Sequence, residues 1–158
     1  MIIRQRIPKP KPLFWVAASC LAWVGCGGPY DAYVSGVATL DGSPLPRGTV
    51  SYNPTQPGPA SYGGILSDGN YLIKTGREEG LPSGEYIVTV VAKEESIPDD
   101  TNRGLPPKPG KTITPLWYLS KQTSNLKFTV EPGSNEINLE LTSEPPPDWK
   151  PPGKRRGR

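Results

Sequence analysis

The stretch that decides the fold is Tyr33–Asn53, YVSGVATLDGSPLPRGTVSYN, which reads as two short β-strands joined by a turn-rich connection. Asp41-Gly42 ends the first strand, because glycine adopts positive φ without steric cost. Pro44 and Pro46 then keep the connection extended and out of any helix. The first strand has the period of two that is typical of a half-buried strand. Its two faces are Val34, Gly36, Ala38 and Leu40, and Tyr33, Ser35, Val37 and Thr39.

The chain continues to residue 141 as short strands divided by turns. Glu85–Lys93 is the most β-prone segment, and both of its faces are apolar enough for a central strand. Ser67–Asn70 carries the Asp-Gly pair of a hairpin turn, and Pro132–Asn135 predicts a second hairpin. The other predicted strands are Tyr62–Leu66, Tyr71–Thr75, Pro115–Leu119, Leu126–Val130 and Glu136–Leu141. About seven strands at this spacing predict an all-β, Greek-key β-sandwich without a helix in the mature domain.

Residues 1–25 have the features of a bacterial lipoprotein signal peptide. A basic start leads into the apolar run Leu13–Val24, which is shorter than the about twenty residues needed to span a bilayer. The run ends at Cys26, where the sequence resembles a lipobox, and acylation there would anchor the chain in the lipid bilayer. The alternatives are a site at Cys20 and ordinary cleavage near Gly25, which would leave Cys26 unmodified.

Composition divides the remaining chain into three parts: a tether over 26–32, the β-sandwich domain over 33–141, and a Pro-rich basic tail over 142–158 that we expect to be disordered. Residues 26–141 hold nine basic and thirteen acidic residues, a net charge of −4, so the domain is not expected to bind nucleic acid. The sequence contains no histidine, which removes the commonest general base and the commonest transition-metal ligand.

Several motifs resemble the carboxypeptidase regulatory-like, transthyretin-like (prealbumin-like) domains of small bacterial lipoproteins. They are Val34–Ala38 with Asp41–Leu45, Ser67–Tyr71 and Leu81–Tyr86, and the likeness extends over residues 33–141. The resemblance implies the fold and says little of function. It withholds the activity of transthyretin-like hydrolases, which use histidines and a C-terminal Tyr-Arg-Gly-Ser that this chain lacks.

The candidate binding residues are aromatic or acidic. Trp117 and Tyr118 could form a platform for sugar stacking, although strand aromatics more often belong to the core. Trp149 lies in the tail, where no core is expected, and could contact a membrane interface or a partner. Asp99 and Asp100 lie in the long polar loop 94–114, which could present them to a partner. We expect no catalytic residue and no cofactor, because the chain lacks histidine. We expect no metal site either, because turn chemistry accounts for Asp68 and Asn70.

These features together favour a non-enzymatic envelope lipoprotein, anchored through acylated Cys26, whose β-sandwich acts as a binding or scaffolding module. The expected location is the outer side of the inner membrane or the outer membrane, and the expected partner is an envelope protein or polysaccharide. One alternative is a carbohydrate- or cell-wall-binding module that uses exposed aromatics. Another is a transthyretin-like hydrolase, which the missing histidines disfavour. The sequence does not define the oligomeric state.

Overall fold

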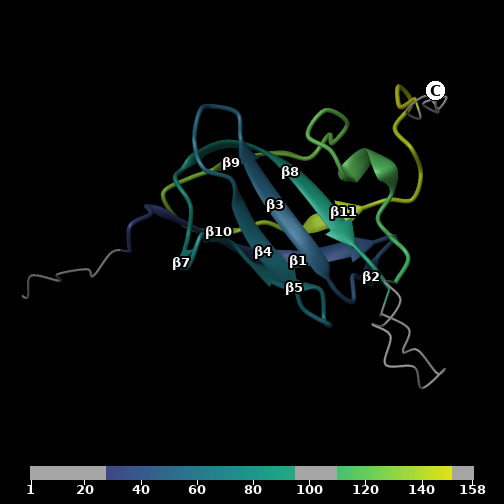
Figure 1. The fold of residues 1–158 in the computed structure, drawn as a ribbon, viewed down its shortest axis with the longest axis horizontal. Coiled ribbons are helices and arrows are strands. Elements are labelled where there is room, and N and C mark those ends of the chain that lie inside the picture. Colours follow the sequence, from purple (N-terminus) through teal and green to yellow (C-terminus); the bar gives the residue numbers. More distant parts are fainter. Residues whose placement is uncertain (1–27, 95–109, 151–158) are drawn as a thin grey trace, which may run out of the picture.

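The structure is a computed structural model that describes residues 28–94 and 110–150. In these residues the chain is all-β and sandwich-like, as predicted, and it contains no α-helix (Figure 1). Seven strands follow one another across a single curled sheet in the order β10-β1-β5-β4-β3-β8-β9. The strands are β1 Ala32–Leu40, β2 Ser43–Pro44, β3 Gly48–Pro54, β4 Ser61–Ile65, β5 Asn70–Leu72, β6 Lys74–Thr75, β7 Glu78–Glu79, β8 Gly84–Ala92, β9 Lys127–Val130, β10 Gly133–Glu136 and β11 Leu139–Leu141.

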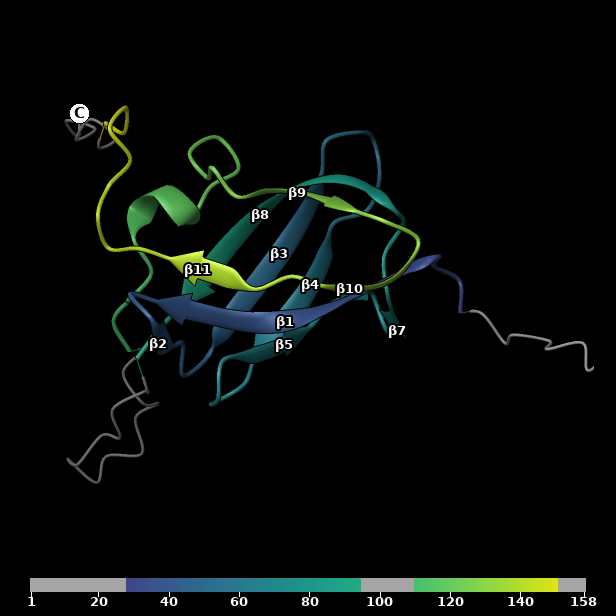
Figure 2. The same cartoon turned by 180° about the vertical axis from the view of Figure 1, so that it is seen from behind.

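The first predicted strand is β1, and it has more partners than any other strand. It pairs antiparallel with β2 and β5, and parallel with β10 and β11. Figure 2 shows β11 running beside β1 in the same direction. The turn after β1 has two residues of positive φ, Asp41 at 49° and Gly42 at 81°, which suit a tight β1–β2 hairpin. β3 does not touch β1 in the sheet, because β5 and β4 lie between them.

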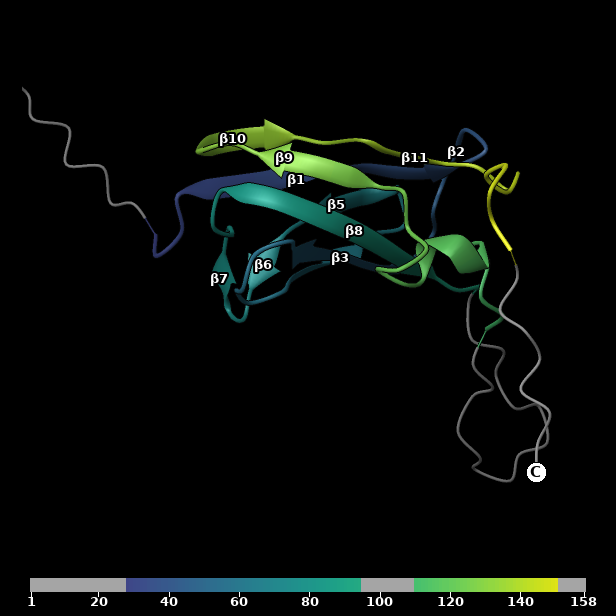
Figure 3. The same ribbon diagram turned by 90° about the horizontal axis from the view of Figure 1, so that it is seen from above.

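The prediction of a final hairpin around Pro132–Asn135 is wrong. β9 pairs with β8, whereas β10 and β11 pair with β1 at the other end of the sheet. The connection between β9 and β10 therefore joins the two ends of the sheet. The sheet curls so that β1 and β10 lie across from β3 and β4 (Figure 3). The turn residues were identified correctly, but the pairing of the strands depends on partners distant in sequence.

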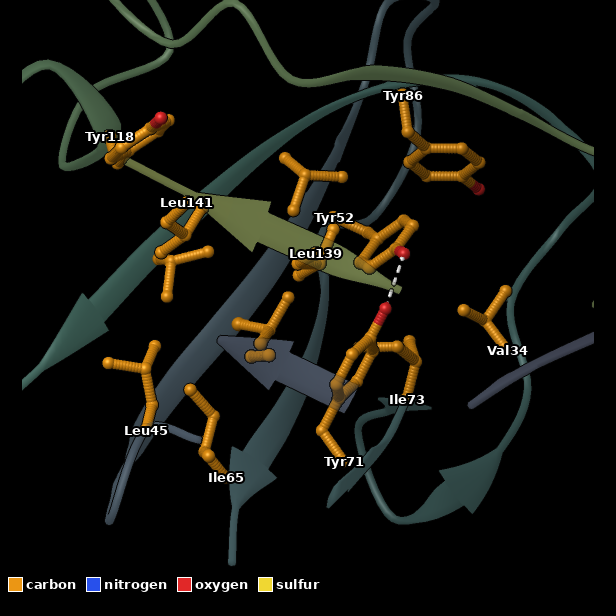
Figure 4. Packing of buried hydrophobic residues seen from close by; sticks show 14 of the residues in the cluster. Val34, Leu45, Tyr52, Ile65, Tyr71, Ile73, Tyr86, Tyr118, Leu139 and Leu141 are labelled. Atoms are coloured by element: carbon orange, nitrogen blue, oxygen red, sulfur yellow. Dashed lines mark hydrogen bonds between the residues drawn. The ribbon is translucent and has the colours of Figure 1, made fainter. Parts of the chain in front are cut away.

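The buried residues confirm the alternation that the sequence predicted. Val34 and Ala38 of β1 are buried, as are Tyr86, Val88 and Val90 of β8, which pairs with β3 and β9. Figure 4 shows buried side chains packed around Tyr52 and Tyr71, whose hydroxyl groups lie 3.1 Å apart in the core. Every buried hydrophobic residue among those described lies between Ala32 and Leu141, so a chain that starts at Gly27 contains this whole core.

A break between β10 and β11 brings the backbone of Ile137 over Gly36 of β1. The Ile137 N–H donates to the Ser35 carbonyl at 2.9 Å, and the side-chain oxygen of Asn138 accepts from the Val37 N–H at 2.9 Å. The Ile137 carbonyl leaves the strand ladder and accepts a hydrogen bond of 2.5 Å from the Tyr71 hydroxyl. A buried hydroxyl of β5 thus holds the segment between β10 and β11 in place.

The prediction of a strand over Pro115–Leu119 is also wrong. Leu116–Tyr118 forms a short 3-10 helix, η1, closed by a hydrogen bond from the Leu119 N–H to the Leu116 carbonyl. Local β-propensity is overridden here. The side chains of Trp117 and Tyr118 are both buried, whereas a strand points successive side chains to opposite faces.

Candidate functional site

Three of the residues proposed from sequence lie outside the described part of the chain. They are Cys26, the lipidation site, and Asp99 and Asp100 of the long loop. Their roles stay predictions. Within the described residues, no helix is long and apolar enough to cross a membrane.

Trp117 and Tyr118 are not a platform for a ligand, because both side chains are buried. Trp117 is 6% exposed and Tyr118 is 3% exposed, and both belong to the hydrophobic core. The Tyr118 hydroxyl accepts a hydrogen bond from the Thr142 N–H at 3.2 Å. Their position at the end of β8 closes one side of the core, so the role is structural.

Trp149 has a packing partner, contrary to the prediction that no core is available to it. Its ring meets Trp117 edge-to-face, with ring centroids 5.1 Å apart and an interplanar angle of 66°. The Ser143 N–H also donates to the Asp41 carboxylate at 2.9 Å, which lowers the pKa of Asp41. Figure 1 shows this segment lying beside η1, so residues 142–150 are attached to the domain at both ends.

This contact is a weak one, since the indole N–H groups of Trp117 and Trp149 are buried without a hydrogen-bond partner in the described residues. An edge-to-face pair contributes about 0.5–1.5 kcal/mol beyond burial, whereas an unsatisfied buried donor costs about 1–3 kcal/mol. The two effects are of similar size and opposite sign.

We therefore expect Trp149→Phe to be at least as stable as the wild type, because phenylalanine keeps the ring contact and removes one unpaired N–H. Trp149→Ala should raise the access of iodide to Trp117, measured by fluorescence quenching, and lower the free energy of unfolding, because the apolar burial of the ring is lost together with the edge-to-face contact. A Trp149→Phe variant that loses stability as Trp149→Ala does would show that the N–H has a partner.

Asp68 and Asn70 serve the β4–β5 turn, as turn chemistry predicts. The Asp68 carboxylate accepts from the Asn70 side chain at 2.6 Å and from the Asn70 backbone N–H at 3.1 Å. These two hydrogen bonds lower the pKa of Asp68. No group of three histidine, cysteine, aspartate or glutamate side chains in the described residues is arranged to hold a metal ion.

The most distinctive surface feature is an apolar groove on the outer face of β1, β5 and β4. Four large hydrophobic side chains are exposed in the described residues, and three of them gather here: Tyr62 at 52%, Leu66 at 62% and Leu72 at 39%. They line an open groove of about 540 Å³. Sequence reasoning missed it, although Tyr62, Gly64 and Leu66 alternate with the buried Gly63 and Ile65 and so occupy the solvent face.

Gly64 makes the floor of this groove. A Cβ built at Gly64 would meet nothing within 4 Å, so the space between Tyr62 and Leu66 stays open. Along a strand, these two side chains stand about 13 Å apart. The neighbouring Gly63 faces inward, where a Cβ would lie 2.6 Å from the Leu72 carbonyl oxygen. The two glycines therefore have different roles: Gly63 lets the strands approach, and Gly64 shapes the surface.

The rim of the groove is polar and close to neutral. Its polar side chains are those of Ser35, Asn70, Lys74 and Glu136. The Lys74 ammonium forms an ion pair with Glu79 at 3.2 Å, across the pairing of β6 with β7. The arrangement can hold a ligand with an apolar face and polar edges, because hydroxyl, amide, ammonium and carboxylate groups surround an aromatic and aliphatic centre.

The fold and the groove together define a β-sandwich-like protein with an apolar groove on its surface, and no metal-binding cluster lies in the described residues. No family model, no curated protein and no solved structure matches this chain. The transthyretin-like resemblance, based on turn and core motifs, therefore stays a prediction.

Proposed function

We propose that this chain is a non-enzymatic, membrane-anchored lipoprotein of the bacterial cell envelope whose β-sandwich binds a ligand through the Tyr62–Leu66–Leu72 groove. The observation that carries the binding role is the gathering of three of the four exposed large hydrophobic side chains over a glycine floor. Scattered single apolar residues are normal on a surface, whereas a cluster with a polar rim is typical of a binding site.

The non-enzymatic part of the proposal has two supports. The sequence holds no histidine, and the groove contains one carboxylate, Glu136, without a second acid beside it. A hydrolytic site normally needs a nucleophile with a base, or a pair of acids. The groove instead combines exposed apolar side chains with hydrogen-bonding groups on its rim, an arrangement that suits the binding of a ligand.

The anchor is supported by the basic start and the apolar run Leu13–Val24 that ends at Cys26. β1 begins at Ala32, so the connecting residues reach about 20 Å at most when extended. A lipid on Cys26 would hold the sandwich close to the membrane on the outer side of the inner membrane or in the outer membrane. Cys26→Ala is the test: the variant should lose the metabolic label of a radioactive fatty acid and leave the detergent phase. A labelled variant would contradict the anchor.

The binding role is tested separately by sedimentation of a chain that starts at Gly27 with purified cell envelope. Gly64→Val should lower the bound fraction at least about fivefold, because valine fills the groove floor while its branched side chain suits a strand. Leu116→Ala is the matched control, since Leu116 is 56% exposed but lies on η1 outside the groove. Equal binding by wild type and Gly64→Val would contradict a role for the groove.

A further inference from the structure

We propose that the groove binds a sugar ring of an uncharged or weakly charged envelope polysaccharide, with Tyr62 as the stacking residue. This inference rests on the proposed function and names its ligand class. The stacking residue is then a tyrosine on the outer face of β4, and not Trp117 or Trp149, which pack on each other.

The first support is the match between the groove and the two-sided chemistry of a pyranose. One face of such a ring carries mainly C–H groups, and its edge carries hydroxyls that both donate and accept hydrogen bonds. Tyr62 and Leu72 offer apolar contact, and Tyr62 is 52% exposed. Ser35, Asn70 and Glu136 on the rim offer hydrogen-bonding groups at the edge.

The second support is size. A groove of about 540 Å³ lies within the range of about 300–1,000 Å³ for small-ligand sites. The large apolar side chains of the groove are only partly exposed, at 52% for Tyr62, 62% for Leu66 and 39% for Leu72. A stable protein partner needs about 800 Å² on each side. The groove therefore suits one or two sugar units better than a second protein chain.

The third support is the pairing of the strands beneath the groove. β4 lies between β3 and β5, and β5 lies between β4 and β1. Their backbone N–H and C=O groups are used in the sheet, so an extended peptide cannot add to them as a further strand. A ligand must instead be recognised by side chains that project from the face.

The fourth support is charge. Lys74 on the rim pairs with Glu79 at 3.2 Å, and Glu136 adds a carboxylate to the same rim. Such a rim does not favour a phosphate group or an anionic lipid headgroup, which a cluster of free cations would attract. Neutral hydroxyl groups fit it better.

The experiment uses the chain from Gly27 and cell envelope prepared in three ways: intact, digested with protease, and digested with protease and then extracted with chloroform and methanol. We expect binding to the third preparation to match binding to the intact envelope. Oligosaccharides released from that preparation by partial acid hydrolysis should compete for the chain. Binding lost after the protease would point to a protein partner, binding lost after the solvent would point to lipid, and either result would overturn the inference.

Variants then place the sugar in the groove. Tyr62→Ala should weaken binding to the extracted polysaccharide about tenfold, whereas Tyr62→Phe should retain most of it, because the ring face is kept. Gly64→Val should lower it at least about fivefold, as for the intact envelope, and Leu116→Ala should leave it unchanged. Equal binding by Gly64→Val and wild type would overturn the assignment.

Failure of this inference is distinguishable from failure of the proposed function. If the wild-type chain binds intact envelope through the groove but not the extracted polysaccharide, the binding role stands and the sugar assignment is wrong. If the wild-type chain binds none of the three preparations, both are wrong.

Discussion

Gly36→Ala is expected to lower the free energy of unfolding by about 3 kcal/mol or more, because no space exists for a single methyl group at this position. A Cβ on Gly36 would lie 2.0 Å from the Ile137 carbonyl oxygen and 2.6 Å from its carbonyl carbon. Overpacking against side chains typically costs about 1–3 kcal/mol. Here the obstacle is backbone, so β1 must separate from the C-terminal strands. Thermal unfolding should show a fall in Tm of about 10 °C or more.

The matched control is Gly64→Ala, the same substitution on a strand of the same sheet. A Cβ at Gly64 meets nothing within 4 Å, and alanine lowers the entropy of the unfolded chain relative to glycine. We expect this variant to be as stable as the wild type or slightly more stable. A Gly36→Ala variant with the stability of Gly64→Ala would show that the backbone of Ile137 does not lie over Gly36 in solution.

The close contact at Gly36 also marks the limit of what the sequence could predict. The alternation in Tyr33–Leu40 identified β1 and its inward face, and the Asp-Gly pairs identified two turns, because these signals are local. The partner over Gly36 is about a hundred residues away, and its position depends on how the whole sheet curls. For the same reason, the sequence predicted the turn at Pro132–Asn135 but assigned the wrong pairing to the strands that follow it.

The candidate site was harder to predict than the fold, for a related reason. Aromatic character alone drew attention to Trp117 and Tyr118, which fill the core beside η1. The exposed aromatic is Tyr62, whose significance depends on two neighbours, Gly64 on its own strand and Leu72 on the next. A strand with glycine at a solvent-facing position between two apolar residues is a local signal. Leu72 lies beside this glycine only because β4 and β5 form a hairpin, and the sequence did predict that hairpin.

The second large effect is expected at high pH and comes from the buried tyrosines. Burial raises the pKa of Tyr71 to about 12, and burial also raises the pKa of Tyr52. In the unfolded chain a tyrosine has a pKa of about 10. Above that pH the unfolded state loses protons that the folded state keeps, so the free energy of unfolding falls. The stability contributed by Tyr71 is complete below about pH 10 and falls by about 1.4 kcal/mol per pH unit until about pH 12.

Tyr71→Phe separates this effect from simple loss of a hydrogen bond. The substitution leaves the Tyr52 hydroxyl and the Ile137 carbonyl without their partner, which should cost about 1–3 kcal/mol near neutral pH. The variant also lacks the group that titrates, so its stability should fall less steeply above about pH 10. The free energies of unfolding of the wild type and the variant should therefore converge as the pH rises, measured by urea unfolding at several pH values.

Tyr62→Phe, which removes an exposed hydroxyl, is the control and should follow the wild type. Parallel curves for Tyr71→Phe and the wild type would mean that water reaches Tyr71, and the core would then be open at the junction between β1 and Ile137.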